Sequence, residues 1–186
     1  MKTIIWKGIL YNSLEYFTLM KSGDGFEATS KIIGTYEDKM YAVDYGILID
    51  SDWKLLQFEV EYEVNNIRGK IAGERVDMAW KLNGAIDPRY SGIGFIDISL
   101  TPFTNTLPIR SLNLDVGQER EIDVIYIDIL ERHILPLKQR YRKEGDGRFR
   151  YQNVPNDFEA TISVDEVGLV IFYPLLFERQ QSLPSS

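Results

Sequence analysis

The sequence predicts a mainly β protein, and three observations support that fold class. Apolar and polar residues alternate with period two over most of the chain, as in "WKLLQFEVEYEV" at residues 53–64. Clusters of Gly, Asp, Asn and Ser separate these runs, and the pair Asn83-Gly84 is typical of a tight hairpin turn. Helical spacing of apolar residues appears in only two short segments. We therefore expect a single β-rich domain over residues 1–186.

The period-two runs predict strands in order along the chain. They cover residues 3–7, 15–20, 31–36, 41–49, 56–64, 68–76, 76–82, 92–100, 120–129, 149–154, 158–164 and 168–173. Side chains of one parity point to one face of a sheet, so the apolar parity predicts the buried face. On that face we expect Leu56, Phe58 and Val60 in one strand, and Met78 and Trp80 in another.

Residues 130–141 are the first segment with helical spacing, because apolar residues stand at positions 130, 134, 137 and 141. Pro136 lies inside this segment and would cost a helix interior about 3 kcal/mol. The segment is therefore predicted to be an extended strand that the proline interrupts.

The second segment, "TPFTNTLPIR" at residues 101–110, predicts one short, kinked helix within 102–112. Thr101 and Pro102 are a good cap and first-turn pair, and Phe103 and Leu107 lie four residues apart on one face. Pro108 restricts the residue before it and is expected to end or restart the helix. We expect this segment to be an internal plug that Phe103 and Leu107 seat against the sheet.

Composition excludes several classes of protein. The net charge of −7 and the pI near 4.8 repel a phosphate backbone, so nucleic acid is not expected as a partner. No run approaches the roughly 20 apolar residues of a transmembrane segment. Cysteine is absent, and Lys7 interrupts the apolar start of the chain, so we expect no disulfides, no secretory signal and a cytoplasmic protein.

These motifs resemble a bacterial family described as glycolipid-binding, which has a spiral β-roll fold. The likeness rests on "TPFTNTLPIR", on Gly117-Gln118, on "YAVDY" at 41–45, on "QRY" at 139–141, and on "VDEVGLVIFYPLLFER" at 164–179. The resemblance implies a spiral β-roll, with many antiparallel strands wrapped around one short helix. It also implies a homodimer and an amphipathic, glycolipid-like ligand.

A sheet rolled around a helix either packs solidly or leaves a hollow. In a hollow, a lipid tail supplies affinity and polar residues select the head group. Arg110 suits a phosphate or carboxylate of a ligand, although an internal salt bridge to Asp97 or to another carboxylate is the more common use of such an arginine. Asn105 suits sugar hydroxyls, or else satisfies backbone groups at a helix end. Arg110, Asn105 and Asp97 are therefore candidate ligand-binding residues.

Three aromatic residues complete the candidate site. Trp80, Tyr45 and Tyr141 offer faces on which a sugar ring can stack, as do Trp53 and Tyr151, although aromatic residues at strand parity are commonly core. Trp80 precedes the predicted hairpin, so we expect it near a rim of the roll.

Catalysis has less support than binding. His133 is the single histidine and stands without a nucleophile motif or metal-ligand spacing, so neither a metal nor a cofactor is expected. Asp97 and Asp165 form a carboxylate pair only if the fold brings them about 5 to 9 Å apart. Three functions stay open: binding of an amphipathic ligand, a small hydrolase or isomerase acting on such a molecule, and a structural or interaction protein with a filled interior.

Overall fold

The computed structural model describes residues 1–155 and 157–183, and it contains one open sheet of fifteen strands. The strands are β1 (Lys2–Gly8), β2 (Ser13–Ser22), β3 (Gly25–Tyr36), β4 (Lys39–Ile49), β5 (Leu55–Val64), β6 (Ile67–Val76), β7 (Ala79–Leu82), β8 (Ala85–Ile86), β9 (Phe95–Ile98), β10 (Glu119–Asp128), β11 (His133–Gly145), β12 (Arg148–Val154), β13 (Glu159–Val164), β14 (Val170–Tyr173) and β15 (Phe177–Leu183). The mainly β prediction is confirmed. The last three residues of the predicted domain, 184–186, lie outside the described part.

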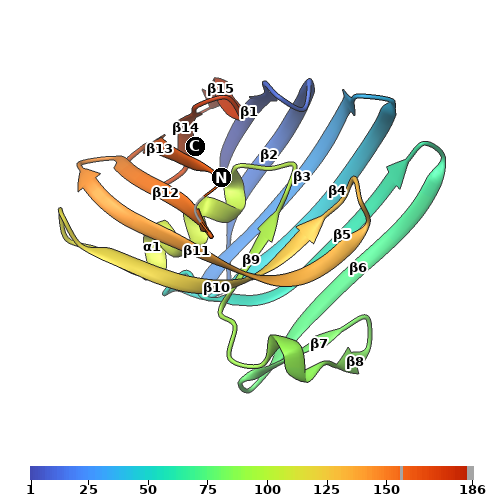
Figure 1. Ribbon diagram of the computed structural model, residues 1–186, viewed down its shortest axis with the longest axis horizontal. Helices are drawn as coiled ribbons and strands as arrows, with labels where there is room; N and C mark the ends of the chain where they lie inside the picture. The colour runs from blue at the N-terminus through green and yellow to red at the C-terminus, as the bar shows by residue number, and fades with distance from the viewer. Residues whose placement is uncertain (156, 184–186) are drawn as a thin grey trace.

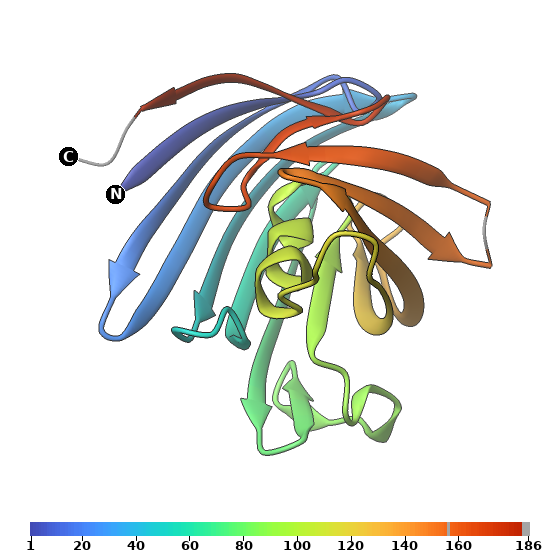
Figure 2. The same cartoon turned by 90° about the vertical axis from the view of Figure 1, so that its left-hand side faces the viewer.

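The sheet grows outward from the two ends of the chain, because β1 pairs with β15 in its middle (Figure 1). From there the strand order runs β1 to β8 on one side and β15 to β9 on the other. Most neighbours in the sheet are therefore neighbours in sequence, joined by antiparallel hairpins. The strands curl, and the helical segment lies inside the curve (Figure 2). This arrangement confirms a sheet rolled around one short helix.

A parallel pair explains why a helix lies inside the roll. β9 pairs with β10 in parallel, with Phe95 opposite Val124, whereas every other described pair is antiparallel. Parallel neighbours need a crossover connection of about a dozen or more residues. Here residues 99–118 make that crossover and pass through the concave side of the sheet. The predicted plug is thus the connection that the parallel pair requires.

The plug consists of the 3-10 turn η2 (Phe103–Asn105) and the helix α1 (Thr106–Ser111). The Oγ1 atom of Thr101 accepts the Phe103 N–H at 3.1 Å, as expected of a cap. All residues from 101 to 109 are buried, which supports the expectation of an internal plug. Pro108 neither ends nor restarts the helix. It lies in the first turn of α1, where N–H groups have no helical acceptor and a proline loses nothing.

The predicted strand at 130–141 is confirmed from His133 onward as part of β11, whereas residues 130–132 lie in the turn before it. Pro136 pairs only with Ile125 of β10, because the pairing of β11 with β12 begins at Lys138. Its missing N–H therefore faces no partner strand, which is where a sheet tolerates proline.

Two predicted core residues are exposed. Leu56 is 45% exposed because β4 and β5 shift register between Leu48 and Ile49, and the shift turns Leu55 inward in its place. Met78 is 64% exposed because it lies in the turn between β6 and β7, where strand alternation stops. Among the described residues, no helix is both long and apolar enough to cross a bilayer.

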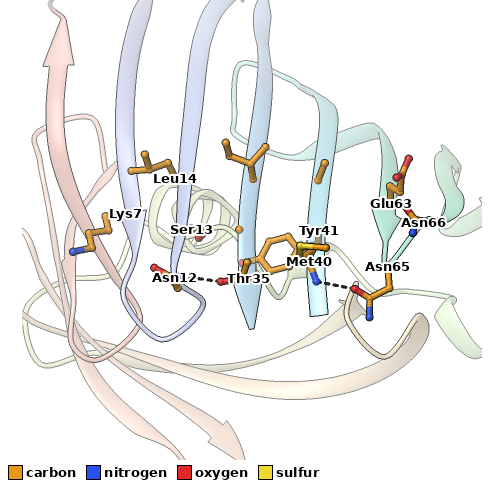
Figure 3. A pocket seen from close by; sticks show the side chains of 13 residues that line it. Lys7, Asn12, Ser13, Leu14, Thr35, Met40, Tyr41, Glu63, Asn65 and Asn66 are labelled. Carbon is orange, nitrogen blue, oxygen red and sulfur yellow. Dashed lines mark hydrogen bonds between the residues drawn. The ribbon is translucent and has the colours of Figure 1, made fainter. Parts of the chain in front are cut away.

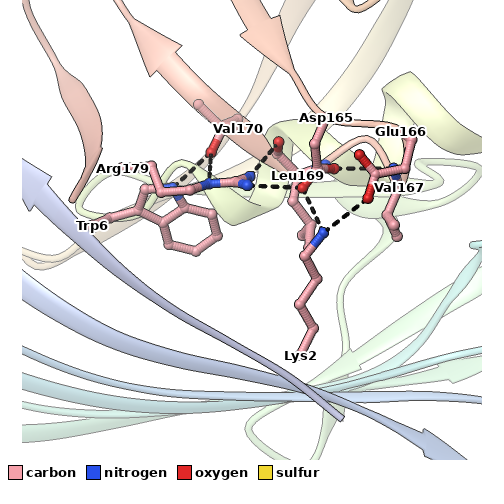
Figure 4. Close-up of polar contacts among 8 residues, drawn as sticks. All are labelled: Lys2, Trp6, Asp165, Glu166, Val167, Leu169, Val170 and Arg179. Atoms are coloured by element: carbon pink, nitrogen blue, oxygen red, sulfur yellow. Dashed lines mark hydrogen bonds and ion pairs between the residues drawn. The ribbon is translucent and has the colours of Figure 1, made fainter. Parts of the chain in front are cut away.

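An ion-pair network joins the last strand to the loop before β14 (Figure 4). Asp165 Oδ2 accepts from the Lys2 ammonium at 2.7 Å and from the Arg179 guanidinium at 2.8 Å. Arg179 also donates to the Leu169 and Val170 carbonyls. Burial opposes ionisation of Asp165, but the two cations and the Leu169 N–H outweigh it and hold the pKa below its ordinary value.

Asp165→Asn is expected to lower the free energy of unfolding by about 2 kcal/mol at pH 7, because Lys2 and Arg179 lose their shared counter-ion in a nearly buried setting. A lowered pKa gives stability above the unfolded value that is lost as pH falls, so the difference should shrink below about pH 4. Urea unfolding at pH 7 and pH 3 measures both effects. Asp52→Asn, which breaks an exposed pair with Lys54, should change stability by less than about 0.5 kcal/mol.

Candidate functional site

A partly enclosed cavity of about 470 Å³ lies between the plug and the strands of the C-terminal half. Its polar lining comes from β9, β11 and the plug, and includes Asp97, Ser99, Thr101, Asn105 and Gln139. Its apolar lining comes from the β1–β2 loop, β11, β12 and the C-terminal strands, and includes Leu10, Leu137, Val154, Phe158, Leu176 and Phe177. The hollow is therefore amphipathic, and its volume is that of a small-molecule site.

Asp97 organises the polar side of the cavity. Its Oδ2 atom accepts from Gln139 Nε2 at 2.6 Å, and its Oδ1 atom accepts from the Thr104 hydroxyl at 3.1 Å. The Tyr141 hydroxyl donates to Asn105 Oδ1 at 2.8 Å, and Gln139 Oε1 lies 3.3 Å from the same hydroxyl. The plug and β11 thus hold the carboxylate in a fixed position.

Burial raises the pKa of Asp97, although the hydrogen bonds from Gln139 and Thr104 act in the opposite direction. The side chain remains partly accessible, and Asp97 itself lines the cavity. Each Asp97 oxygen accepts one hydrogen bond from the residues that the structure describes. Because a carboxylate oxygen can accept two, Asp97 can still accept hydrogen bonds from a ligand.

Tyrosines form the wall beside Asp97. The Tyr151 ring lies 5.4 Å from Tyr141 and 5.8 Å from Tyr173, and Tyr11 packs 5.9 Å from Phe177. Burial, with the nearby charges of Asp97 and Asp128, raises the pKa of Tyr11 to about 12. The same burial raises the pKa of Tyr151 and Tyr173, so these hydroxyls stay protonated and can donate.

The hydroxyls of Tyr11, Tyr151 and Tyr173 make no hydrogen bond to any described residue, and all three residues line the cavity. Each of these hydroxyl oxygens remains accessible to solvent. These three hydroxyls are therefore available to a ligand. Sequence reasoning selected Tyr151 only as a stacking face and missed Tyr11 and Tyr173, because an aromatic residue at strand parity gives no sign of whether its hydroxyl is satisfied.

The predicted site residues fall into two groups. Asp97 and Asn105 line the cavity, and Tyr141 supports them from behind. Trp80 is not near a rim but fully buried, where its Nε1–H donates to the Ile93 carbonyl at 2.8 Å and its ring packs 5.7 Å from Phe58. The short strand β8 after the hairpin turns back into the 3-10 turn η1 (Pro88–Tyr90), which covers this end.

Arg110 does not reach Asp97 or the cavity. It is exposed at the end of α1, with its guanidinium 5.2 Å from the centre of the Trp53 ring. A Cβ atom at Gly168 would lie 2.7 Å from Arg110 Cδ, so the arginine stem fills the space that this glycine leaves. Arg110 therefore forms no salt bridge to Asp97, and its side chain packs against Trp53 and Gly168 instead. Ligand binding by Arg110 stays a prediction.

Tyr45 belongs to a separate buried cluster around Glu15, a residue that sequence reasoning did not select. Glu15 Oε1 accepts from the hydroxyls of Tyr45 at 2.7 Å, Ser30 at 2.8 Å and Thr101 at 2.9 Å. Burial nevertheless dominates these hydrogen bonds and raises the pKa of Glu15 to about 7. The cluster ties β2, β3 and β4 to the first residue of the plug.

The carboxylate pair of a glycosidase is not assembled here. Asp97 lines the inner cavity, whereas Asp165 lines a different hollow near Arg110 and is held by Lys2 and Arg179. His133 is exposed at the start of β11. Within residues 1–155 and 157–183, no group of three His, Asp or Glu side chains is placed to hold a metal ion.

A larger hollow of about 680 Å³ lies on the outer face of β1 to β5 (Figure 3). The exposed side chains of Leu14 and Met40 lie on it, and Asn12 donates to the Thr35 hydroxyl along its lower rim. This groove is open, and Ser13 is the buried polar residue among the described residues that line it. The inner cavity, with its oriented carboxylate and unpaired hydroxyls, is therefore the candidate site.

The fold and the cavity together define a class: a β-roll whose crossover helix fills part of the interior and leaves an amphipathic hollow beside it. Within that class the chain belongs to the family described as "Putative glycolipid-binding", whose model matches residues 3–179. A crystal structure of a DUF1089 family protein from Pseudomonas aeruginosa is 32% identical, with a TM-score of 0.80, over 89% of this chain and 91% of that one. No curated protein matches the sequence. The predicted family resemblance is confirmed.

Proposed function

We propose that the protein binds an amphipathic ligand, a glycolipid or another lipid with a polar head group, in the cavity beside the plug. The observation that carries this proposal is the pairing of opposite linings in one hollow. Apolar side chains such as Leu137 and Phe158 line one part, and Asp97 with the unpaired tyrosine hydroxyls lines the other. The family description supports a binding role of this kind.

The apolar lining and the polar lining contribute differently to binding. Each methylene that leaves water contributes about 0.8 kcal/mol, so a tail of several methylenes supplies most of the affinity. The polar side selects the head group, because leaving a buried donor or acceptor unpaired costs about 1 to 3 kcal/mol. An apolar molecule without a head group would leave the carboxylate and the hydroxyls dry and unpaired.

Organic extracts of protein purified without detergent should contain a co-purifying amphipathic molecule, measured by mass spectrometry. Leu137→Trp places a larger side chain in the cavity and is expected to reduce the extracted ligand at least about tenfold, while the hollow leaves room for the fold to persist. The melting temperature checks that the variant is folded.

Leu14→Trp is the matched control, because it adds the same bulk to the outer groove. It should leave the extracted ligand unchanged. Loss of ligand from Leu14→Trp but not from Leu137→Trp would place binding on the outer face and contradict the proposal.

A further inference from the structure

We propose that Asp97 makes this cavity selective for an uncharged, hydroxyl-bearing head group and excludes phosphate and other anionic head groups. The inference rests on the proposed function, since it concerns the ligand of the same cavity. It goes beyond the proposed function because it states that the head group is uncharged and that Asp97 is the residue responsible for this selectivity.

The charges around the cavity favour this selectivity. Among the described residues that line it, Lys138 is the one cation, while Asp97 and Asp157 are acids. The Lys138 ammonium already contacts Glu121 at 3.2 Å and Asp123 at 3.3 Å. Arg110, the other cation considered for an anionic head group, lines a different hollow. An anion entering the cavity would therefore meet a carboxylate and no free cation.

The hydrogen-bonding groups lead to the same conclusion. Gln139 and Thr104 each donate to one Asp97 oxygen, so the carboxylate keeps acceptor positions but offers no donor. The hydroxyls of Tyr151 and Tyr173 can both donate and accept. Hydroxyl groups of a ligand satisfy both kinds of partner, because an O–H donates to the carboxylate and accepts from a tyrosine. A phosphate cannot donate to Asp97 once it is fully ionised.

The low polarity around Asp97 strengthens the preference of the cavity for a neutral head group over an anionic one. The same burial that raises the pKa of Asp97 penalises a second negative charge placed beside it. Like charges brought together in such a setting reduce affinity on the order of a hundredfold or more.

Two probes with the same tail test the inference: octyl β-glucoside and octyl phosphate, titrated calorimetrically below their micelle concentrations at pH 8. The wild-type protein is expected to bind the glucoside, and to bind the phosphate on the order of a hundredfold more weakly. Asp97→Asn keeps the shape and removes the charge, so it should narrow this ratio at least about tenfold, mainly by improving phosphate binding. Asp44→Asn, which removes an exposed acid on β4 that does not line the cavity, should leave the ratio unchanged.

The outcomes separate the two proposals. Equal or tighter binding of octyl phosphate by the wild type would overturn the inference about Asp97 and leave the binding function intact. If neither probe binds and no extracted ligand is found, both proposals fail. The wild-type comparison decides the selectivity of the cavity without any variant. An unchanged ratio of the two affinities in a folded Asp97→Asn protein would overturn the assignment of that selectivity to Asp97.

Discussion

Leu107→Ala is expected to lower the free energy of unfolding by about 2 to 5 kcal/mol, because it removes a fully buried side chain from the middle of the plug. Leu107 lies on α1, and Phe103, one turn earlier, packs 4.6 Å from Phe17 of β2. The sheet encloses the plug, so no single strand or loop can move in to fill the cavity that the missing side-chain atoms leave. The cost should therefore lie in the upper part of that range.

Urea unfolding at pH 7 measures this loss, with Leu14→Ala as the control. Leu14 is 52% exposed on the outer face of β2, so the same chemical change there should cost less than about 1 kcal/mol. A loss of less than about 1 kcal/mol for Leu107→Ala would mean that the plug does not contribute to the stability of the roll.

Glu15→Gln is expected to remove a pH-dependent loss of about 3 kcal/mol, so that its stability stays level from pH 5 to pH 7, where that of the wild type falls. The pKa of Glu15 is raised from 4.5 to about 7, and a difference of about 2.5 multiplied by 1.36 kcal/mol gives about 3 kcal/mol. A raised pKa means that the folded state holds the proton more tightly than the unfolded chain. Stability from this proton is complete below about pH 4.5 and is lost as pH rises through about 7.

The glutamine keeps the oxygen that accepts from Ser30, Tyr45 and Thr101, so the hydrogen bonds to the plug are retained while the charge is removed. Urea unfolding between pH 5 and pH 9 compares the two proteins. Glu74→Gln, an exposed change of the same charge on β6, should follow the wild-type curve. An equal decline of Glu15→Gln and wild type between pH 5 and pH 7 would show that another group causes the dependence.

Most strands could be predicted from sequence because alternation is a local property. Each strand turns successive side chains to opposite faces, so the pattern is visible wherever one face is buried. The alternation misleads where a bulge or turn changes parity, as at Leu56 and Met78. It is ambiguous in β2, where Leu14 and Tyr16 are apolar but exposed, and their presence hides the fact that Glu15 points into the core.

The plug was predictable because its composition conflicts with a strand. Thr101, Pro102 and Pro108 favour a cap and a first turn, and those preferences act over a few residues. Its role as the crossover of a parallel pair was not predictable, since nothing within residues 101–110 specifies that β9 lies beside β10 in parallel.

The sequence by itself determined the fold class, the helical insert and the family of this protein, because alternation, capping and a characteristic motif are all properties of short segments. Only the tertiary structure brought the residues of the candidate site together. Asp97 meets Gln139 and Tyr141 meets Asn105 across separations of 42 and 36 residues, whereas Arg110, a candidate from the sequence, packs against Trp53 outside the cavity. These long-range contacts depend on the strand order and on the path of the crossover through the roll. Both result from packing the apolar faces of the whole chain into one core.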